Sequence, residues 1–187
     1  MRRQAICYNE GYIYFAGGLD LTTNQSVKSC ARYNIVTEKW QMVSPMLFDK
    51  MDASLCAINE YQIAVAGGIN SQNKLTDLVE IYDARENQWR LFEIGLSSPR
   101  RLTSMISSQK DRVIIIGGKE KDNSETKTVE EIDFLKRNLV NLEFLKQERC
   151  NCQSFLVNDV IYSFGGSKNE VEVAEGEKYS IKENRWR

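Results

Sequence analysis

The residue types that usually carry catalysis are scarce in this chain. Its 187 residues include no histidine, which removes the most common general base and the most common metal ligand. Cys150 and Cys152 are spaced like two ligands on one face of a strand, but no second cysteine pair is available to complete a zinc site. We interpret the five cysteines as structural thiols, and the sequence predicts no catalytic residue, no metal site and no cofactor.

Two other features could carry chemistry, and both are better explained by structure. Glu130 and Glu131, or the glutamates from Glu170 to Glu177, could supply an acid–base pair, but nothing in the sequence places two carboxylates across a cleft. A solvated surface is their expected setting. Four glycine pairs could be mistaken for phosphate-binding loops, but none has the glycine spacing of such a loop and none opens a predicted helix. We expect the glycines to be structural.

The glycine pairs recur every 48 to 50 residues and mark a repeated unit along the chain. Each pair ends a short apolar run, and each is followed by two large apolar residues that lie seven positions apart. The repeat positions are Gly17, Gly18, Tyr33 and Trp40; Gly67, Gly68, Tyr82 and Trp89; Gly117, Gly118, Ile132 and Leu139; and Gly165, Gly166, Tyr179 and Trp186. Several features in one register indicate a true repeat.

This pattern resembles the kelch repeat over essentially the whole chain. The third repeat departs from it, since Ile132 and Leu139 replace the tyrosine and tryptophan, and the fourth has a shorter loop after its glycines. The resemblance implies an all-β fold of kelch-type β-propeller blades, with about four four-stranded antiparallel blades in one domain over residues 1–187. The approximate blades are 1–50, 51–99, 100–148 and 149–187.

The residue pattern supports such blades independently of the resemblance to the kelch repeat. The run before each glycine pair is apolar at nearly every position, as expected for a strand covered on both faces by neighbouring blades. Two adjacent glycines have no side chains to hold blades apart and can adopt backbone angles that other residues avoid. The tyrosine and tryptophan positions are then expected to fill the wedge between blades.

One segment favours a different structure on its local pattern. Between residues 129 and 145, apolar residues are spaced by three and four positions, which is typical of an amphipathic helix. The repeat register instead places Ile132 and Leu139 where Tyr82 and Trp89 lie in the second repeat. We predict two strands here, because tertiary context often overrides local propensity.

Four blades are few for a kelch propeller, which typically has five to seven. The sequence begins and ends in phase with the repeat, so we predict an incomplete propeller with an apolar blade face exposed at each end. Further blades would complete it, either in a longer form of the polypeptide or in a partner chain. A closed ring of four blades is the alternative.

Composition limits the partners and the compartment. The net charge of −1 gives no global field that would favour nucleic acid or an anionic membrane. No apolar run approaches the roughly 18 to 20 residues needed to span a bilayer, and the first residues lack the apolar core of a signal peptide. An odd number of irregularly spaced cysteines fits a reducing compartment. We expect a cytoplasmic protein that binds no nucleic acid and does not insert into membranes.

The candidate binding residues lie in loops. In a four-stranded blade, the loop after the second strand and the connection to the next blade lie on one propeller face, and loops on a rigid scaffold commonly carry recognition. The connections contain five basic residues: Lys50, Arg100, Arg101, Lys146 and Arg149. We predict that they form a basic rim that engages an acidic segment of a partner protein. Ordinary solvated charge in turns is the alternative.

The resemblance also implies a function, because kelch proteins are mostly protein-interaction modules. We expect a non-catalytic scaffold within a larger assembly, with the cytoskeleton or cilia as the setting that the resemblance suggests. One alternative is the substrate-recognition part of a cullin-type ubiquitin ligase adaptor. A propeller enzyme is a remote alternative, since the sequence contains no catalytic constellation.

Overall fold

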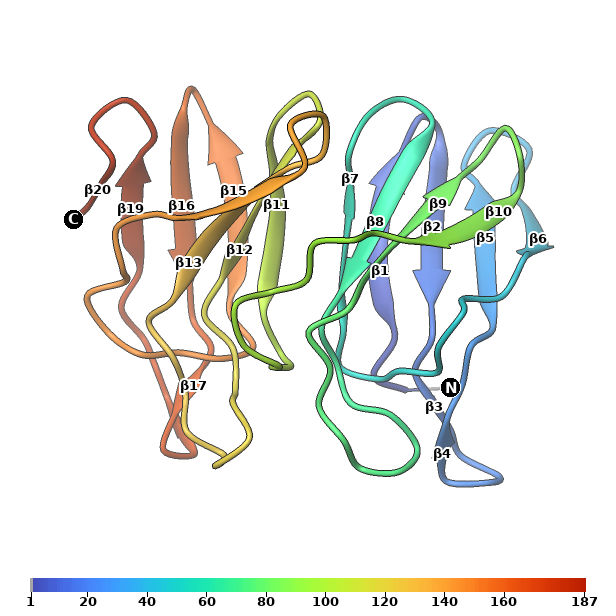
Figure 1. Ribbon diagram of the computed structural model, residues 1–187, viewed down its shortest axis with the longest axis horizontal. Helices are drawn as coiled ribbons and strands as arrows, with labels where there is room; N and C mark the ends of the chain where they lie inside the picture. Colours follow the sequence, from blue (N-terminus) through green and yellow to red (C-terminus); the bar gives the residue numbers. More distant parts are fainter. Residues whose placement is uncertain (1) are drawn as a thin grey trace.

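The computed structural model describes residues 2–187 and contains four four-stranded antiparallel sheets, one for each repeat. Figure 1 shows them as propeller blades, with blades 1 and 2 in its right half and blades 3 and 4 in its left half. Blade 1 consists of β1 (Ala5–Asn9), β2 (Tyr12–Ala16), β5 (Cys30–Asn34) and β6 (Lys39–Val43). Blade 2 consists of β7 (Ser54–Ala57), β8 (Gln62–Ala66), β9 (Val79–Asp83) and β10 (Gln88–Leu91).

The remaining blades repeat this order along the chain. Blade 3 consists of β11 (Ser104–Gln109), β12 (Arg112–Ile116), β13 (Val129–Asp133) and β14 (Asn138–Asn141). Blade 4 consists of β15 (Gln153–Val157), β16 (Val160–Phe164), β19 (Glu177–Ser180) and β20 (Arg185–Trp186). Two short hairpins follow the glycine pairs of the outer blades, β3 (Leu19–Asp20) with β4 (Gln25–Ser26) and β17 (Ser167–Lys168) with β18 (Val171–Glu172).

The third repeat forms strands and no helix, as the repeat register predicts. Ile132 on β13 pairs with Leu139 on β14, just as Tyr82 pairs with Trp89 in blade 2. Both Val129 and Ile132 are fully buried against neighbouring blades. The helix-like spacing of apolar residues is therefore overridden by tertiary packing. Among the described residues, no helix is long and apolar enough to cross a membrane.

Neighbouring blades contact each other in chain order. The inner strands β1 and β7, β7 and β11, and β11 and β15 lie side by side, whereas no comparable contact joins β1 to β15 among residues 2–187. The four blades therefore form an open arc with three internal junctions. We call the side of a blade that faces the preceding blade its leading face, and the opposite side its trailing face.

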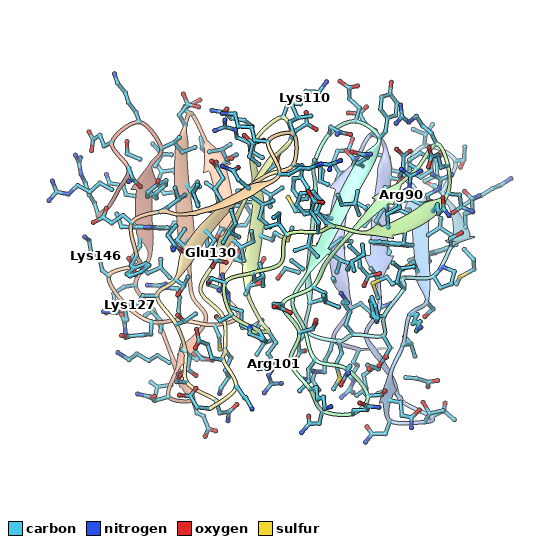
Figure 2. All side chains as sticks on the ribbon, viewed as in Figure 1. Arg90, Arg101, Lys110, Lys127, Glu130 and Lys146 are labelled. Carbon is cyan, nitrogen blue, oxygen red and sulfur yellow. The ribbon has the colours of Figure 1, made fainter. Side chains whose placement is uncertain are left out.

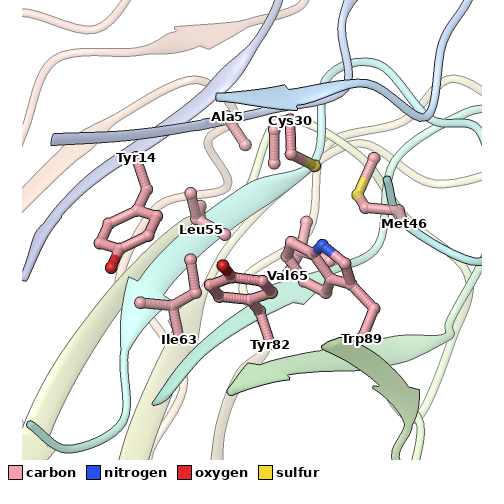
Figure 3. Close-up of a cluster of buried hydrophobic side chains, with 10 residues drawn as sticks. Ala5, Tyr14, Cys30, Met46, Leu55, Ile63, Val65, Tyr82 and Trp89 are labelled. Carbon is pink, nitrogen blue, oxygen red and sulfur yellow. The ribbon is translucent and has the colours of Figure 1, made fainter. Parts of the chain in front are cut away.

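Each junction buries one trailing face against one leading face. At the first junction, Tyr14 and Ala16 from the trailing face of blade 1 lie in one cluster with Val65, Tyr82 and Trp89 from the leading face of blade 2 (Figure 3). Corresponding clusters fill the second and third junctions. The core is thus divided among the junctions, and no blade buries its apolar faces alone.

The glycine pairs permit the close fit that the sequence predicts. The N–H of Gly68 donates to the carbonyl oxygen of Arg100, in the connection to the next blade, at 2.9 Å. A β-carbon on Gly67 would overlap that same oxygen. For Gly165 in blade 4, no heavy atom of residues 2–187 lies within 4 Å of the place its β-carbon would occupy. The constraint on the first glycine therefore comes from the neighbouring blade as well as from its positive φ.

The aromatic pairs confirm the repeat and identify its unpartnered end. The rings of Tyr82 and Trp89 are 5.2 Å apart, and those of Tyr33 and Trp40 are 5.3 Å apart, so the pair has the same local geometry in both blades. Trp89 is nevertheless 4% exposed and Trp40 is 63% exposed. The difference arises because blade 1 packs on the leading face of blade 2, whereas no blade within residues 2–187 packs on the leading face of blade 1.

Candidate partner-binding face

The loops after the second strand of each blade and the connections between blades lie at one end of the molecule, the lower edge of Figure 1. Hydrogen bonds tie these two sets together. The N–H of Ser71, in the loop of blade 2, donates to the Asp49 carboxylate in the first connection at 2.8 Å, and the Ser98 hydroxyl donates to Glu120 at 3.2 Å. We call this end the loop face: residues 19–26, 69–76, 119–126 and 167–169 with the connections 45–50, 97–101 and 145–149.

Three of the five basic residues predicted on this face are buried, so the predicted rim is wrong for them. Lys50, Arg100 and Arg149 are at most 1% exposed. Each forms an ion pair with a buried glutamate on the third strand of the blade that it precedes. The pairs are Lys50 with Glu80 at 2.8 Å, Arg100 with Glu130 at 2.6 Å and Arg149 with Glu177 at 2.7 Å.

The glutamates explain why these charges are inside. Glu80 also accepts the N–H of Leu47 at 2.6 Å, and Glu130 accepts the N–H of Ser97 at 3.1 Å, so each carboxylate holds the connection that arrives from the preceding blade. A buried charge is tolerated when it is paired and hydrogen-bonded, and removing one partner of such a pair typically costs about 3–5 kcal/mol. These residues stabilise the blade junctions and are not available to a binding partner.

Arg149 shows this role most completely. Besides Glu177, its guanidinium donates to the carbonyl oxygens of Gly165 at 3.2 Å and Glu175 at 3.0 Å. Glu177 in turn accepts the N–H of Lys146 at 2.6 Å. The expectation of a solvated surface for Glu130 and Glu177 is also wrong, because both carboxylates pair with these buried cations.

The two remaining basic residues are accessible but lie apart. Lys146 is exposed and pairs with Glu143 at 3.1 Å on the outer edge of blades 3 and 4, whereas Arg101 lies near the middle of the loop face (Figure 2). The five predicted residues therefore do not form a joint rim. Arg101 is the member that remains in a position central to the loop face.

Arg101 pairs with Asp52, which lines a polar cavity between the four inner strands. The first residues of the four inner strands line a cavity of about 390 Å³. In its lining, the Asp52 carboxylate accepts from Arg3 at 2.6 Å and from Arg101 at 3.0 Å. Arg3, Asp52 and Leu102 all have a positive φ, of 60°, 55° and 55°. The N–H of Leu102 donates to the carbonyl oxygen of Asp52 at 2.9 Å, which links successive blades around the cavity.

Arg101 also lines a groove between the loops of blades 2 and 3. The groove has a volume of about 500 Å³. Its lining combines apolar, basic, amide and acidic side chains: Ile69, Leu75 and Pro99; Lys74, Arg101 and Lys121; Asn73 and Asn123; and Glu120. Three basic side chains and one carboxylate line the groove, and of the three only Arg101 is paired with Asp52 at 3.0 Å, so Lys74 and Lys121 make the groove suited to an extended segment that carries both acidic and apolar side chains.

The thiols behave as small buried side chains. Cys30, Cys56, Cys150 and Cys152 are buried and Cys7 is half-buried, and all five are free thiols. Burial raises the pKa of the Cys56 thiol to about 12 and that of Cys30 to about 11, so both remain protonated. Among residues 2–187, no cluster of three or more cysteine, aspartate and glutamate residues could hold a metal ion.

Sequence reasoning missed the buried ion pairs, although a signal for them was present. Arg100 precedes Glu130 by 30 residues and Arg149 precedes Glu177 by 28, so acid and base recur in register with the glycine pairs. The groove was harder to predict from the sequence, because Lys74 and Lys121 belong to loops of different blades and no sequence spacing connects them. Only the packing of blades 2 and 3 brings those loops together.

A family model described as the kelch motif matches residues 2–47 and 148–187, which form most of blades 1 and 4. The Kelch repeat and BTB domain-containing protein 6 of Homo sapiens is 30% identical over 84 residues, or 45% of this chain and 11% of that protein. Kelch-like protein 41b of Danio rerio is 23% identical over 158 residues, or 84% of this chain and 26% of that protein.

A third relative is likewise similar over only part of its length. Kelch-like protein 35 of Mus musculus is 27% identical over 109 residues, which are 58% of this chain and 18% of that protein. The aligned parts therefore span 11% to 26% of the length of these relatives. The similarity concerns the repeated blades and does not reach over the whole of the longer proteins.

Proposed function

Because this chain belongs to the kelch-motif family, we propose that it is a non-catalytic protein-interaction scaffold within a larger assembly. In this proposal the protein works in the cytoplasm, with the cytoskeleton or cilia as its setting. Its partners are other proteins, without nucleic acid or membrane insertion. The observation that carries the proposal is the groove of about 500 Å³ on the loop face, which is lined by Lys74, Arg101 and Lys121 together with the apolar side chains of Ile69, Leu75 and Pro99. Such a surface suits an acidic segment of a partner.

The test is a binding measurement with a defined probe. A fluorescein-labelled peptide of alternating glutamate and leucine is titrated with the chain and followed by fluorescence anisotropy, with a glutamine-for-glutamate peptide as the uncharged control. We expect the charged peptide to bind more tightly, and its affinity to fall as salt is raised. Equal binding of the two peptides would refute an electrostatic role for the groove.

Charge reversal locates the site. The double variant Lys74→Glu and Lys121→Glu should weaken binding by about tenfold, since an exposed ion pair contributes about 0.2–1 kcal/mol and reversal replaces attraction by repulsion. Lys110→Glu is the matched control, because Lys110 lies at the opposite end of the molecule (Figure 2) and is also exposed. Arg100 is unsuitable for this test, since it is buried. If Lys110→Glu weakens binding as much as the groove variant, the groove is not the site.

A second candidate is favoured by one observation. The relative from Homo sapiens carries a BTB domain in its name as well as kelch repeats. This chain could accordingly form the substrate-recognition part of a cullin-type ubiquitin ligase adaptor. Co-purification of a cullin with the native polypeptide would favour that reading, and its absence from the purified native complex would favour the scaffold.

A further inference from the structure

An acidic residue joins the loops of neighbouring blades at the first junction. Asp49 lies in the connection between blades 1 and 2 and directly precedes the buried Lys50. Its carboxylate accepts the hydroxyl hydrogen of Ser26 from the loop of blade 1 and the N–H of Ser71 from the loop of blade 2, the second at 2.8 Å. One carboxylate therefore bridges the two loops.

The third junction has the same arrangement with other partners. Glu148 lies in the connection between blades 3 and 4 and directly precedes the buried Arg149. It pairs with Lys127, just after the loop of blade 3, at 3.3 Å and with Lys168, in the loop of blade 4, at 2.7 Å. A carboxylate at this position of the connection is thus a recurrent bridge between adjacent loops.

Proline occupies this position at the second junction. In all three connections, the second glycine of the preceding blade donates its N–H to the carbonyl oxygen of the buried basic residue at 2.9 Å, which aligns the connections residue by residue. Pro99 directly precedes Arg100, so it lies where Asp49 and Glu148 lie in the other two. A proline side chain carries no charge and accepts no hydrogen bond, so this bridge is missing between blades 2 and 3.

The loops at the second junction keep the groups that such a bridge would bind. Lys121 lies three residues after Gly118, as Ser71 lies three residues after Gly68, and the N–H of Lys121 forms no hydrogen bond within residues 2–187. In the same part of the chain, the ammonium groups of Lys74 and Lys121 form no ion pair, and both lysines line the groove beside Pro99. Positive groups from two neighbouring loops thus lack the carboxylate that the other junctions supply.

The carboxylate in the groove lining does not replace the bridge. Glu120 belongs to the loop of blade 3 and accepts the hydroxyl hydrogen of Ser98 at 3.2 Å, so it ties that loop to the connection and not to the loop of blade 2. The apolar side chains of Ile69, Leu75 and Pro99 also line the groove. The groove therefore offers a place for one further carboxylate next to apolar surface.

We propose that a glutamate or aspartate of a partner protein takes the place of the missing bridge, with its carboxylate between the loops of blades 2 and 3. The carboxylate accepts the N–H of Lys121 and pairs with the ammonium groups of Lys74 and Lys121, while neighbouring apolar side chains of the partner lie on the apolar part of the groove lining. This inference rests on the proposed interaction function. It adds where the acidic side chain binds, and that Pro99 leaves the place open for it.

Supplying the bridge from within the chain tests the position without any partner. Pro99→Glu introduces a carboxylate where Asp49 and Glu148 lie in the other connections. Pro99→Gln is the matched control, since both changes remove the proline ring and only the first adds charge. The urea midpoint of Pro99→Glu should exceed that of Pro99→Gln by about 0.2–0.4 M. Adding Lys74→Gln and Lys121→Gln to both variants should remove this difference, because the carboxylate then has no cation to pair with.

Peptide binding tests the partner's carboxylate. The fluorescein-labelled peptide of alternating glutamate and leucine is titrated with each variant and followed by fluorescence anisotropy. Pro99→Glu should bind it about tenfold more weakly than Pro99→Gln, because the internal carboxylate occupies the lysines. Ser97→Glu is the control for added charge, since Ser97 is exposed in the same connection but does not line the groove. It should weaken binding by less than about threefold.

The outcomes separate this inference from the proposed function. Equal binding of the charged and uncharged peptides to the wild-type chain would remove the proposed function and this inference with it. A charged peptide that prefers the wild type, yet binds Pro99→Glu as tightly as Pro99→Gln, would overturn this inference alone. Equal urea midpoints of the two Pro99 variants, or a loss of binding in Ser97→Glu as large as in Pro99→Glu, would overturn it as well. Thermal unfolding of each variant verifies that it is folded.

Discussion

Replacing Gly67 by alanine measures what close blade contact contributes to stability. Gly67 has a φ of 65° and Gly165 a φ of 66°, so alanine is strained at both positions by about 1–2 kcal/mol. At Gly67 the new β-carbon also overlaps the carbonyl oxygen of Arg100, whereas at Gly165 it meets nothing within 4 Å. Gly165→Ala therefore serves as the matched control for backbone strain.

The additional cost at Gly67 follows from what must move. The connection that contains Arg100 has to shift, which breaks its hydrogen bond from Gly68 and leaves buried polar groups unpaired, at about 1–3 kcal/mol. Forcing a methyl group into this tight junction adds about 1–3 kcal/mol. We expect a total loss of about 3–8 kcal/mol for Gly67→Ala, compared with about 1–2 kcal/mol for Gly165→Ala.

Differential scanning calorimetry checks the difference. For a protein of this size, each kcal/mol lowers Tm by about 2–4 °C, so Gly165→Ala should lower Tm by about 4 °C and Gly67→Ala by about 16 °C. Gly117→Ala should resemble Gly67→Ala, because its β-carbon would overlap the carbonyl oxygen of Arg149 in the same way. Equal losses at Gly67 and Gly165 would show that the interblade approach contributes nothing and that only φ matters.

Three further outcomes are expected. Leu102→Gly should raise the free energy of unfolding by about 1 kcal/mol, because Leu102 has a φ of 55°. Asn151→Gly, at a φ of 56°, should raise it by less, since asparagine tolerates this conformation. Urea unfolding measures both free energies. A hydrogen bond from Lys168 lowers the pKa of Glu148 to about 2. The stabilisation that ionised Glu148 contributes is therefore present above the unfolded pKa of about 4.3 and is lost as pH falls toward 2. Glu148→Gln should reduce the acid-induced drop in the urea midpoint, and an unchanged drop would contradict this. Cys56 should resist iodoacetamide at mildly alkaline pH until the chain unfolds, as mass spectrometry of the labelled protein would show, because burial raises its pKa to about 12.

The division of the basic residues illustrates where prediction from sequence failed. Lys50 and Arg101 both belong to connections between blades, and no feature of the local sequence separates them. Lys50 is buried because Glu80 from the third strand of the next blade reaches it, whereas Arg101 remains partly exposed and meets Asp52 at the central cavity. The partner that decides each outcome is distant in sequence, so local charge patterns cannot reveal it.

The sequence by itself determined the repeat, the blade strands and the interior role of the glycine and aromatic positions. Spacing near 50 residues aligns units that share one hydrophobic pattern, and that register correctly outweighed the helical spacing around Ile132. These properties are local to a blade and repeat in every copy of it, which is why pattern alone suffices.

Only the tertiary structure decided which surfaces remain free. Trp40 and Trp89 occupy the same repeat position, yet one is exposed and the other buried. The groove beside Arg101 likewise exists only because loops of adjacent blades meet. Exposure depends on what lies beside a residue in space, and neighbouring blades supply that environment from residues remote in the chain.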